Sequence, residues 1–335
     1  MRIHLVALTL AALPALSAPR AWAQTPDVAA IVDGHVLPHY RALASESAEL
    51  AGAAAADCAP DSVQLRTAYG DAFDAWIAVS HLRFGPSEAD DRAFALAFWP
   101  DSRGATPKAL GRLISAEDPV IASLEAFQTV SIAARGFYAM EFMLYDPQFA
   151  SVGDADYRCS LVQVMAADIA GNGAAILAGW EDGYADLMRQ AGNDTYRTPD
   201  EAAKQLFTAL STGLEFTADT RLGRPLGSFD TPRPNRAEAR RSGRSLRHVV
   251  LSLRALRDLA ARLSGGDAGL DAAFARALQR ADLLDDPVFA GVSDPQGRLR
   301  VETLHQRISE IREHVSSQLG PRLGIAAGFN AMDGD

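Results

Sequence analysis

The sequence is poor in lysine, aromatic residues and cysteine. Among 335 residues, 7% are aromatic, 22% are charged, and the 32 basic residues include only two lysines, Lys108 and Lys204. A formal net charge of −10 provides no general basic surface for phosphate backbones, so nucleic acid is not an expected partner. The hydrophobic share of 48% and a mean hydropathy of −0.03 exclude a disordered chain and a polytopic membrane protein.

The first 23 residues have the composition of a secretory signal peptide. Arg2 precedes an apolar run from Leu5 to Leu16, and Ala21-Trp22-Ala23 supplies the small residues of a signal-peptidase site. We expect cleavage between Ala23 and Gln24 and a periplasmic mature protein. The apolar run is short for a membrane span. A lipid anchor would need a cysteine at the cleavage site, and the sequence has none there. The mature protein is therefore predicted not to span a membrane.

Cys58 and Cys159 are the only cysteines. In an oxidising compartment a lone pair of cysteines predicts one disulfide, and two unpaired buried thiols are the alternative. The bridge would close a long loop and stabilise the fold by roughly 4 kcal/mol in the chain-entropy model.

The hydrophobic pattern predicts an all-α fold. Alanine and leucine recur three and four positions apart, and alternating β-branched runs are missing. The expected helices are Val28–Ala56, Ser62–Leu82, Pro107–Ala116, Phe127–Tyr145, Asp156–Ala191, Pro199–Phe216, Asn235–Ser264, Gly269–Leu283 and Arg300–Leu319.

The clearest break is a glycine- and proline-rich segment from Gly223 to Pro234, which cannot continue a helix. We expect the boundary between a longer N-terminal and a shorter C-terminal bundle near Gly192 to Thr198. Helices of these lengths with short connections favour antiparallel packing. We therefore predict a signal peptide (1–23) followed by two fused antiparallel helical bundles, 24–196 and 197–335.

Several separated segments combine glycine, arginine and aromatic residues more densely than a plain helix needs. They are Trp76 to Pro86, Phe98 to Gly104, Arg135 to Leu144, Arg241 to Arg247 and Gly328 to Asp335, together with the opening His35-Val36-Leu37-Pro38-His39-Tyr40. Taken together they resemble the imelysin family, exported helical proteins also classed as peptidase family M75, over nearly the whole mature chain. The resemblance implies two fused helical bundles, a periplasmic or surface location, a link to iron acquisition and an iron-uptake membrane component as partner.

The family signature Gly-x-His-x-x-Glu corresponds to Gly136-Phe137-Tyr138-Ala139-Met140-Glu141, with Tyr138 in place of the histidine. On a helix, positions 138 and 141 share one face, so Tyr138 and Glu141 can reach one ion. A neutral phenol is a poorer zinc ligand than imidazole, whereas a phenolate with a carboxylate suits ferric iron. In the alternative, Tyr138 packs between the bundles and Glu141 pairs with Arg83 or Arg244.

Three histidines are weaker metal candidates. His81 and Arg83 come at a predicted helix end, where they either join the polar cluster of Glu141 or interact favourably with the helix dipole. His35 and His39 have the i, i+4 spacing of metal ligands, but Pro38 between them favours a solvated or partly packed surface feature.

The remaining candidates lie in loops and at a helix start. Asp101 and Arg103 follow Trp99-Pro100 and either line the cleft or only hold the turn. Within the basic stretch 233–257, Arg244 and Ser245 are expected to contact the cleft while the other arginines are solvated, because guanidinium groups pair with carboxylates. The C-terminal family segment adds Asp333.

The leading hypothesis is a non-enzymatic imelysin-like protein that binds a metal ion, a small iron complex or a partner in the cleft between two bundles. A second hypothesis is a metallopeptidase in which Glu141 is a ligand or general base and His81 replaces the missing histidine. A third is an interaction module whose degenerate site no longer holds metal. No nucleophile elbow, phosphate loop or His-Glu-x-x-His motif occurs.

Overall fold

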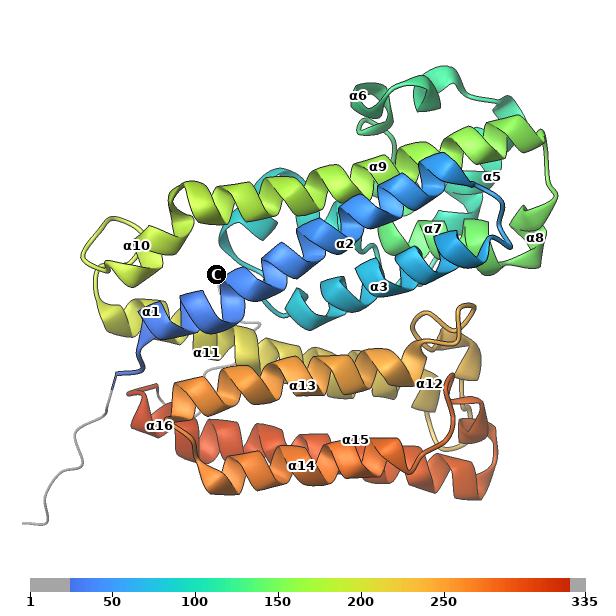
Figure 1. The fold of residues 1–335 in the computed structure, drawn as a ribbon. Coiled ribbons are helices and arrows are strands. Elements are labelled where there is room, and N and C mark those ends of the chain that lie inside the picture. Colours follow the sequence, from blue (N-terminus) through green and yellow to red (C-terminus); the bar gives the residue numbers. More distant parts are fainter. Residues whose placement is uncertain (1–24, 326–335) are drawn as a thin grey trace, which may run out of the picture.

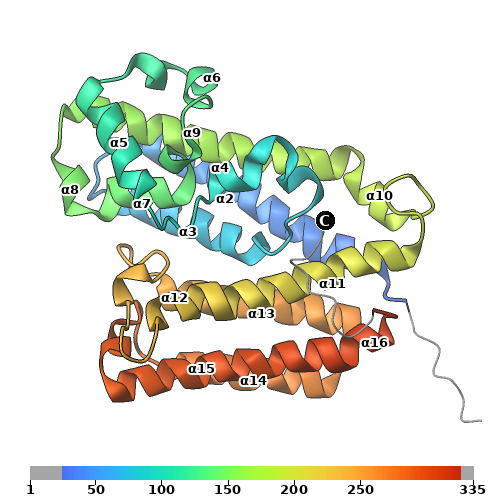
Figure 2. The same cartoon turned by 180° about the vertical axis from the view of Figure 1, so that it is seen from behind.

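The structure is a computed structural model that describes residues 25–325. Within this range every regular element is a helix, which confirms the predicted all-α fold. Two helix groups lie one above the other in Figure 1, and Figure 2 shows the same two layers from behind. The first helix group comprises residues 28–189 and the second comprises residues 199–322.

The first helix group is built around three long helices. α2 packs most extensively against α3 and α9, and a single π-helical turn, Val32–Val36, joins α1 to α2 into one rod. Ser62 caps the start of α3 by accepting a hydrogen bond from the backbone N–H of Leu65. The helices are α1 (Val28–Ile31), α2 (Leu37–Ala56), α3 (Val63–Val79), α4 (Arg92–Leu96), α5 (Ala105–Ala116), α6 (Leu124–Phe127), α7 (Gly136–Tyr145), α8 (Pro147–Ala150), α9 (Ala155–Gly179) and α10 (Ala185–Arg189).

The second helix group consists of four long, roughly antiparallel helices with short additions (Figure 1). α11 begins at Pro199 behind the cap Thr198, where the fixed φ of proline suits a first turn. α13 packs against α3 of the first group as well as against α11 and α14. The helices are α11 (Pro199–Glu215), α12 (Gly223–Leu226), α13 (Ser245–Ser264), α14 (Ala268–Asp282), α15 (Pro295–His314) and α16 (Gly320–Arg322).

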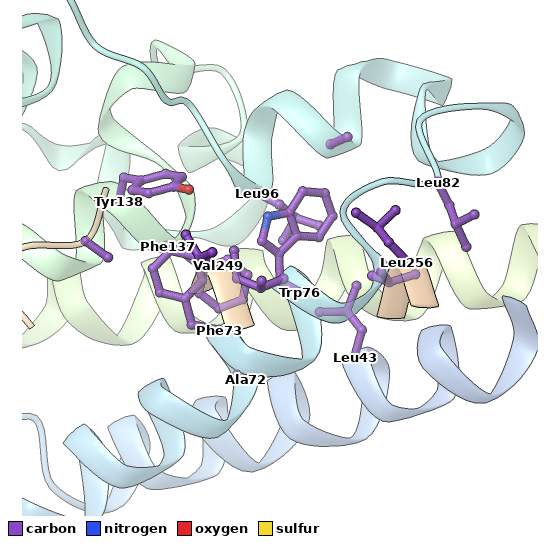
Figure 3. Close-up of a cluster of buried hydrophobic side chains, with 14 of the residues drawn as sticks. Leu43, Ala72, Phe73, Trp76, Leu82, Leu96, Phe137, Tyr138, Val249 and Leu256 are labelled. Carbon is purple, nitrogen blue, oxygen red and sulfur yellow. The ribbon is translucent and has the colours of Figure 1, made fainter. Parts of the chain in front are cut away.

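The hydrophobic core runs without interruption through both helix groups. Where they meet, Phe73 of α3 stacks on Phe137 of α7 with ring centroids 4.8 Å apart, and Val249 and Leu256 of α13 lie in the same cluster (Figure 3). Because side chains from both groups complete one core, their relative position is set by close packing. The boundary at residues 196 and 197 stays a prediction.

Two predicted helices are broken by glycines in a left-handed conformation. The helix expected over Phe127–Tyr145 is broken, because α6 ends at Phe127 and Gly136 has a φ of +72° at the start of α7. The helix expected from Asn235 begins only at Ser245, because Gly243 also has a φ of +72°, outside the helical region. The second break creates the segment 235–241, which lines the small cavity described below.

The predicted disulfide is confirmed. Cys58, just after α2, is bonded to Cys159 in α9, with Cα atoms 5.2 Å apart and 101 residues between them in sequence. The bond links the end of α2 to the helix that packs along it.

Among the described residues, one helical stretch, 155–189, is long and apolar enough to cross a membrane by length and composition alone. Its apolar window is 56% buried inside the protein, where α9 packs against α2 and α7. This stretch serves the fold as a core helix.

Candidate functional site

Two cavities lie where the helix groups meet. The large cavity, about 470 Å³, is walled by the end of α3 and the segment after it, by α4 and α7, and by α11 and the π-helical turn Phe216–Leu222. The small cavity, about 240 Å³, is walled by α7, by the loop before α5 and by the segments around α12 and before α13. Trp99 and Tyr138 line both cavities, and the two are therefore neighbours.

The glycine that opens the family signature is required by the backbone around it. Gly136 has a φ of +72°, and a Cβ atom there would lie 2.2 Å from the carbonyl oxygen of Leu96 and 2.3 Å from that of Ala95. The preceding Arg135 forms a buried bidentate ion pair with Asp168 of α9, at 2.7 and 2.9 Å. Together these contacts fix where α7 begins and aim Tyr138 and Glu141 between the groups.

Tyr138 packs between the helix groups, as one of the two sequence alternatives expected. Its hydroxyl donates a hydrogen bond to Oε1 of Glu238, and its ring stacks on Trp99 at 6.0 Å and meets Phe73 edge-on at 5.1 Å. Burial and the neighbouring Glu238 carboxylate raise the pKa of Tyr138 well above 10, so the hydroxyl stays protonated.

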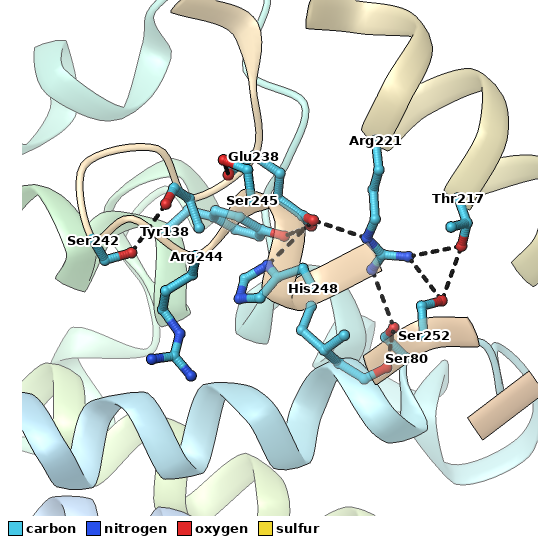
Figure 4. A network of polar contacts seen from close by, with 12 residues as sticks. Ser80, Tyr138, Thr217, Arg221, Glu238, Ser242, Arg244, Ser245, His248 and Ser252 are labelled. Atoms are coloured by element: carbon cyan, nitrogen blue, oxygen red, sulfur yellow. Dashed lines mark hydrogen bonds and ion pairs between the residues drawn. The ribbon is translucent and has the colours of Figure 1, made fainter. Parts of the chain in front are cut away.

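Glu238 is the centre of a buried polar network (Figure 4). Arg221 donates through Nε to Oε2 of Glu238 at 2.8 Å and through Nη1 to the hydroxyl of Ser252 at 3.2 Å. His248 Nδ1 lies 3.2 Å from the same carboxylate oxygen, without hydrogen-bond geometry. Burial by itself would raise the pKa of Glu238, but Arg221, His248 and the Tyr138 hydroxyl outweigh burial and lower it to about 2. The carboxylate is therefore ionised and holds Tyr138 in place.

Glu141 is 3% exposed and lines the small cavity. Its Oε1 atom accepts hydrogen bonds from the backbone N–H and the hydroxyl of Ser242, at 2.9 and 2.7 Å. Burial raises its pKa, and the Ser242 hydrogen bonds counteract part of that increase. The expected pairing with Arg83 or Arg244 is wrong: Arg83 pairs with Glu88, close to it in the chain, and Arg244 pairs with Asp74 of α3.

His81 joins a histidine network away from Glu141. Its Nε2 atom lies 2.9 Å from Nε2 of His35, and Nδ1 of His35 lies 2.7 Å from Oδ2 of Asp258 on α13. Burial lowers the pKa of His35 and places that of His81 well below its ordinary value, so both rings are neutral. His81 and Arg83 line the large cavity whereas Glu141 lines the small one, so the expected single polar cluster is wrong.

The fully buried His35 also corrects the expectation of a surface histidine pair. The π-helical turn Val32–Val36 places its ring against His81, and Nδ1 of His39 lies 2.6 Å from the carbonyl oxygen of His35. The two rings are neighbours, 4.6 Å apart between centroids, although Pro38 lies between them in sequence.

The other predicted residues have mostly structural contacts. Asp101 accepts hydrogen bonds from the backbone N–H groups of Ala105 and Thr106, at 2.9 and 2.8 Å, and so holds the start of α5. Arg103 is exposed, and its own backbone N–H rather than its guanidinium contacts Asp101. The hydroxyl of Ser245 donates to the carbonyl oxygen of Glu238. Asp333 lies outside the described residues.

Sequence reasoning did not find the partners that shape the site. The sequence did not single out Glu238, Asp258, Arg221 or Ser242 as candidate site residues. One signal was present: a buried tyrosine hydroxyl requires a hydrogen-bond partner. The identity of that partner, 100 residues away, depends on how the helix groups meet.

Across residues 25–325, no group of three or more histidine, cysteine, aspartate or glutamate side chains converges as a metal site. Tyr138 and Glu141 are each engaged by side chains of the second helix group, and His81 is engaged by His35.

The fold and site define an all-α protein with two ligand-sized cavities between its helix groups. A solved imelysin-like protein from Psychrobacter arcticum 273-4 has the same fold, with a TM-score of 0.76, 20% identity and coverage of 90% of this chain and 96% of that one. A protein described as an iron-regulated protein A precursor, from Parabacteroides distasonis ATCC 8503, has a TM-score of 0.73, 15% identity and coverage of 93% and 98%.

The peptidase M75 family model, described as imelysin, matches residues 36–315. The chain therefore belongs to the imelysin family. Comparison with curated proteins gives no match.

Proposed function

We propose that this imelysin-family member is an exported protein associated with iron uptake, and that it binds a small iron complex in the large cavity. The family assignment and the fold shared with a protein described as iron-regulated support the link to iron. The Cys58–Cys159 disulfide suits an oxidising compartment, in line with the predicted signal peptide, which lies outside the described residues.

The large cavity is the observation that carries this proposal. At about 470 Å³ it has room for a small complex, and its wall combines the aromatic rings of Trp76, Trp99 and Phe216 with polar groups such as His81 and Tyr138. Pockets of mixed, mainly apolar lining with a few placed polar groups are typical of small-molecule sites.

The polar contacts favour a complex over a bare ion. The hydroxyl of Tyr138 donates to Glu238, and its raised pKa disfavours the phenolate that ferric iron would need. Nδ1 of His81 makes no hydrogen bond to any described residue, so this neutral ring has a nitrogen left for the ligand. In an iron complex the small molecule already supplies ligands to the metal. The protein then needs to provide only the contact with His81 and the aromatic walls of the cavity.

No observation favours the peptidase alternative. A hydrolytic site would need His81 and Glu141 around one ion, whereas the structure places them in the walls of different cavities. The interaction module without a metal site remains the competing hypothesis, and binding measurements separate it from the proposal.

The test is a titration of the protein with ferric citrate, ferric iron, ferrous iron and zinc, monitored by calorimetry and absorption. We expect the ferric complex to bind, with affinity reduced about tenfold in His81→Asn through loss of one ligand contact. Arg276→Gln, an exposed residue of α14 away from both cavities, is the matched control.

Tyr138→Phe and Glu141→Ala complete the set. Binding of bare ferric iron with a phenolate-to-iron absorption band that Tyr138→Phe abolishes would overturn the preference for a complex. If the wild-type protein binds neither the complex nor an ion, the metal hypothesis fails and the interaction module is left.

A further inference from the structure

The small cavity has positive charge that nothing in the described chain neutralises. Arg224 and Arg236 line it, and neither side chain forms an ion pair or hydrogen bond with any residue of 25–325. Nε of Arg224 is buried without a partner, and its guanidinium lies 5.7 Å from the ring centroid of Trp99. An unpartnered buried donor carries a desolvation penalty that an incoming acceptor removes.

The arginines nearby are divided between paired and unpaired side chains. Arg221 pairs with Glu238, Arg241 pairs with Asp146, and both Arg244 and Arg247 pair with Asp74. Arg233, Arg240 and Arg254 also form no ion pair with a described residue, so Arg224 and Arg236 are distinguished by their place in the cavity wall and not by being unpaired.

The carboxylates in the cavity wall are already engaged. Asp101 accepts backbone N–H groups at the start of α5, and Glu141 accepts both donors of Ser242. Burial, and then the charge of Arg236, lower the pKa of Arg224, because neighbouring guanidinium groups repel each other.

The cavity limits what can supply the missing charge. Its volume of about 240 Å³ equals the liquid volume of about eight water molecules at roughly 30 Å³ each, so it excludes a peptide or a nucleotide chain. Guanidinium groups bind planar oxygen pairs through two parallel hydrogen bonds, and Trp99 supplies a flat wall beside Arg224. We propose that the small cavity is a binding site for a small multivalent oxyanion, a di- or tricarboxylate or phosphate, held by Arg224 and Arg236.

This site is distinct from the large cavity, and its test uses no metal, so its failure leaves the iron proposal untouched. Metal-free malonate, citrate and phosphate are titrated into the wild-type protein at low salt by calorimetry, with neutral malonamide as the matched ligand control. We expect at least one oxyanion to bind and malonamide not to bind. If the carboxylates bind and phosphate does not, the site takes a carboxylate; the reverse result shows that it takes a phosphate.

Three variants locate the binding. Arg224→Gln and Arg236→Gln are each expected to weaken binding about tenfold or more, since each removes a charged hydrogen-bonding partner. Arg276→Gln, likewise an arginine without an ion pair but on α14, is expected to bind as the wild type does. Arg236 is exposed, so its variant keeps the test valid if Arg224→Gln fails to fold.

The inference is overturned if no oxyanion binds better than malonamide, or if folded Arg224→Gln and Arg236→Gln proteins, checked by thermal unfolding, both bind with wild-type affinity.

Discussion

Two polar networks cross the boundary between the helix groups, and they differ in their access to water. In the closed network, Tyr138, Glu238 and Arg221 are all buried, with Glu238 at 1% and Arg221 at 3% exposed. In the open network, the buried His35 and His81 end at Asp258, whose side chain is 43% exposed. Bulk water therefore reaches the carboxylate of the open network directly, whereas Glu238 is shielded from it.

Both networks reach the wall of the large cavity, which Tyr138 and Arg221 of the closed network and His81 of the open network line. The difference in water access implies that the closed network mainly fixes how the helix groups meet, whereas the open network can change its protonation without a large loss of stability. The experiments below test that division.

The largest effect is expected from Glu238→Gln. The substitution leaves the Arg221 guanidinium buried without its carboxylate, and breaking a buried ion pair in this way reduces the free energy of unfolding by about 3–5 kcal/mol. Urea denaturation followed by circular dichroism measures the change. Asp271→Asn, which breaks the half-exposed pair with Arg257, is the matched control and should cost less than about 1 kcal/mol.

A loss for Glu238→Gln as small as that for Asp271→Asn would show that water reaches Arg221, and the distinction between a closed and an open network would then not hold.

Asp258→Asn should have a smaller effect, a reduction of about 1–2 kcal/mol in the free energy of unfolding. It weakens the hydrogen bond to Nδ1 of His35, but Asp258 is close to half-exposed, so solvent screens the charge. The same denaturation measurement applies. An effect equal to that of Glu238→Gln would mean that the open network is also required for the packing of the two groups.

Glu238 and Asp258 should contribute differently to the loss of stability in acid. The contribution of Asp258 is expected to be the smallest effect of all. Arg221 and His248 overcome burial to lower the pKa of Glu238 from 4.5 to about 2, and His35 and Arg262 likewise lower that of Asp258 from 3.8 to about 2. Each carboxylate therefore contributes stability that is present above its ordinary pKa and is lost as the pH falls towards 2.

The measurement is the urea midpoint as a function of pH between 5 and 2. We expect Glu238→Gln to flatten this dependence below pH 4.5 and Asp258→Asn to flatten it less, because solvent already screens the exposed carboxylate. A wild-type profile that neither variant flattens would assign the acid sensitivity to other groups.

Much of the fold could be predicted from local signals. The apolar spacing predicts the helices, Ser62 and Thr198 mark two helix starts, and a lone pair of cysteines predicts the bond between Cys58 and Cys159. The errors came at Gly136 and Gly243, where a positive φ interrupts an otherwise helical pattern. Glycine tolerates both helical and left-handed backbone, so its presence alone does not say which one occurs.

The candidate site could be predicted only in part. The spacing of Tyr138 and Glu141 places both on one helix, and they do face the second helix group. Their partners Glu238 and Ser242, and the contact of His81 with His35, could not be predicted, because each joins residues that are distant in the chain and meet only when the groups pack.

The sequence by itself therefore determined the helical class and the disulfide. It also determined that α7 carries the family signature with Tyr138 in place of the histidine, since all three follow from spacing and residue type. Only the tertiary structure decided which charges are buried in pairs and which arginines of the small cavity are left without partners. It also decided that Tyr138 and His81 both line the large cavity whereas Glu141 does not. The physical reason is that burial and hydrogen-bond pairing depend on contacts between separate segments, up to 100 residues apart for Tyr138 and Glu238, and no local pattern encodes which of many similar arginines and carboxylates will meet.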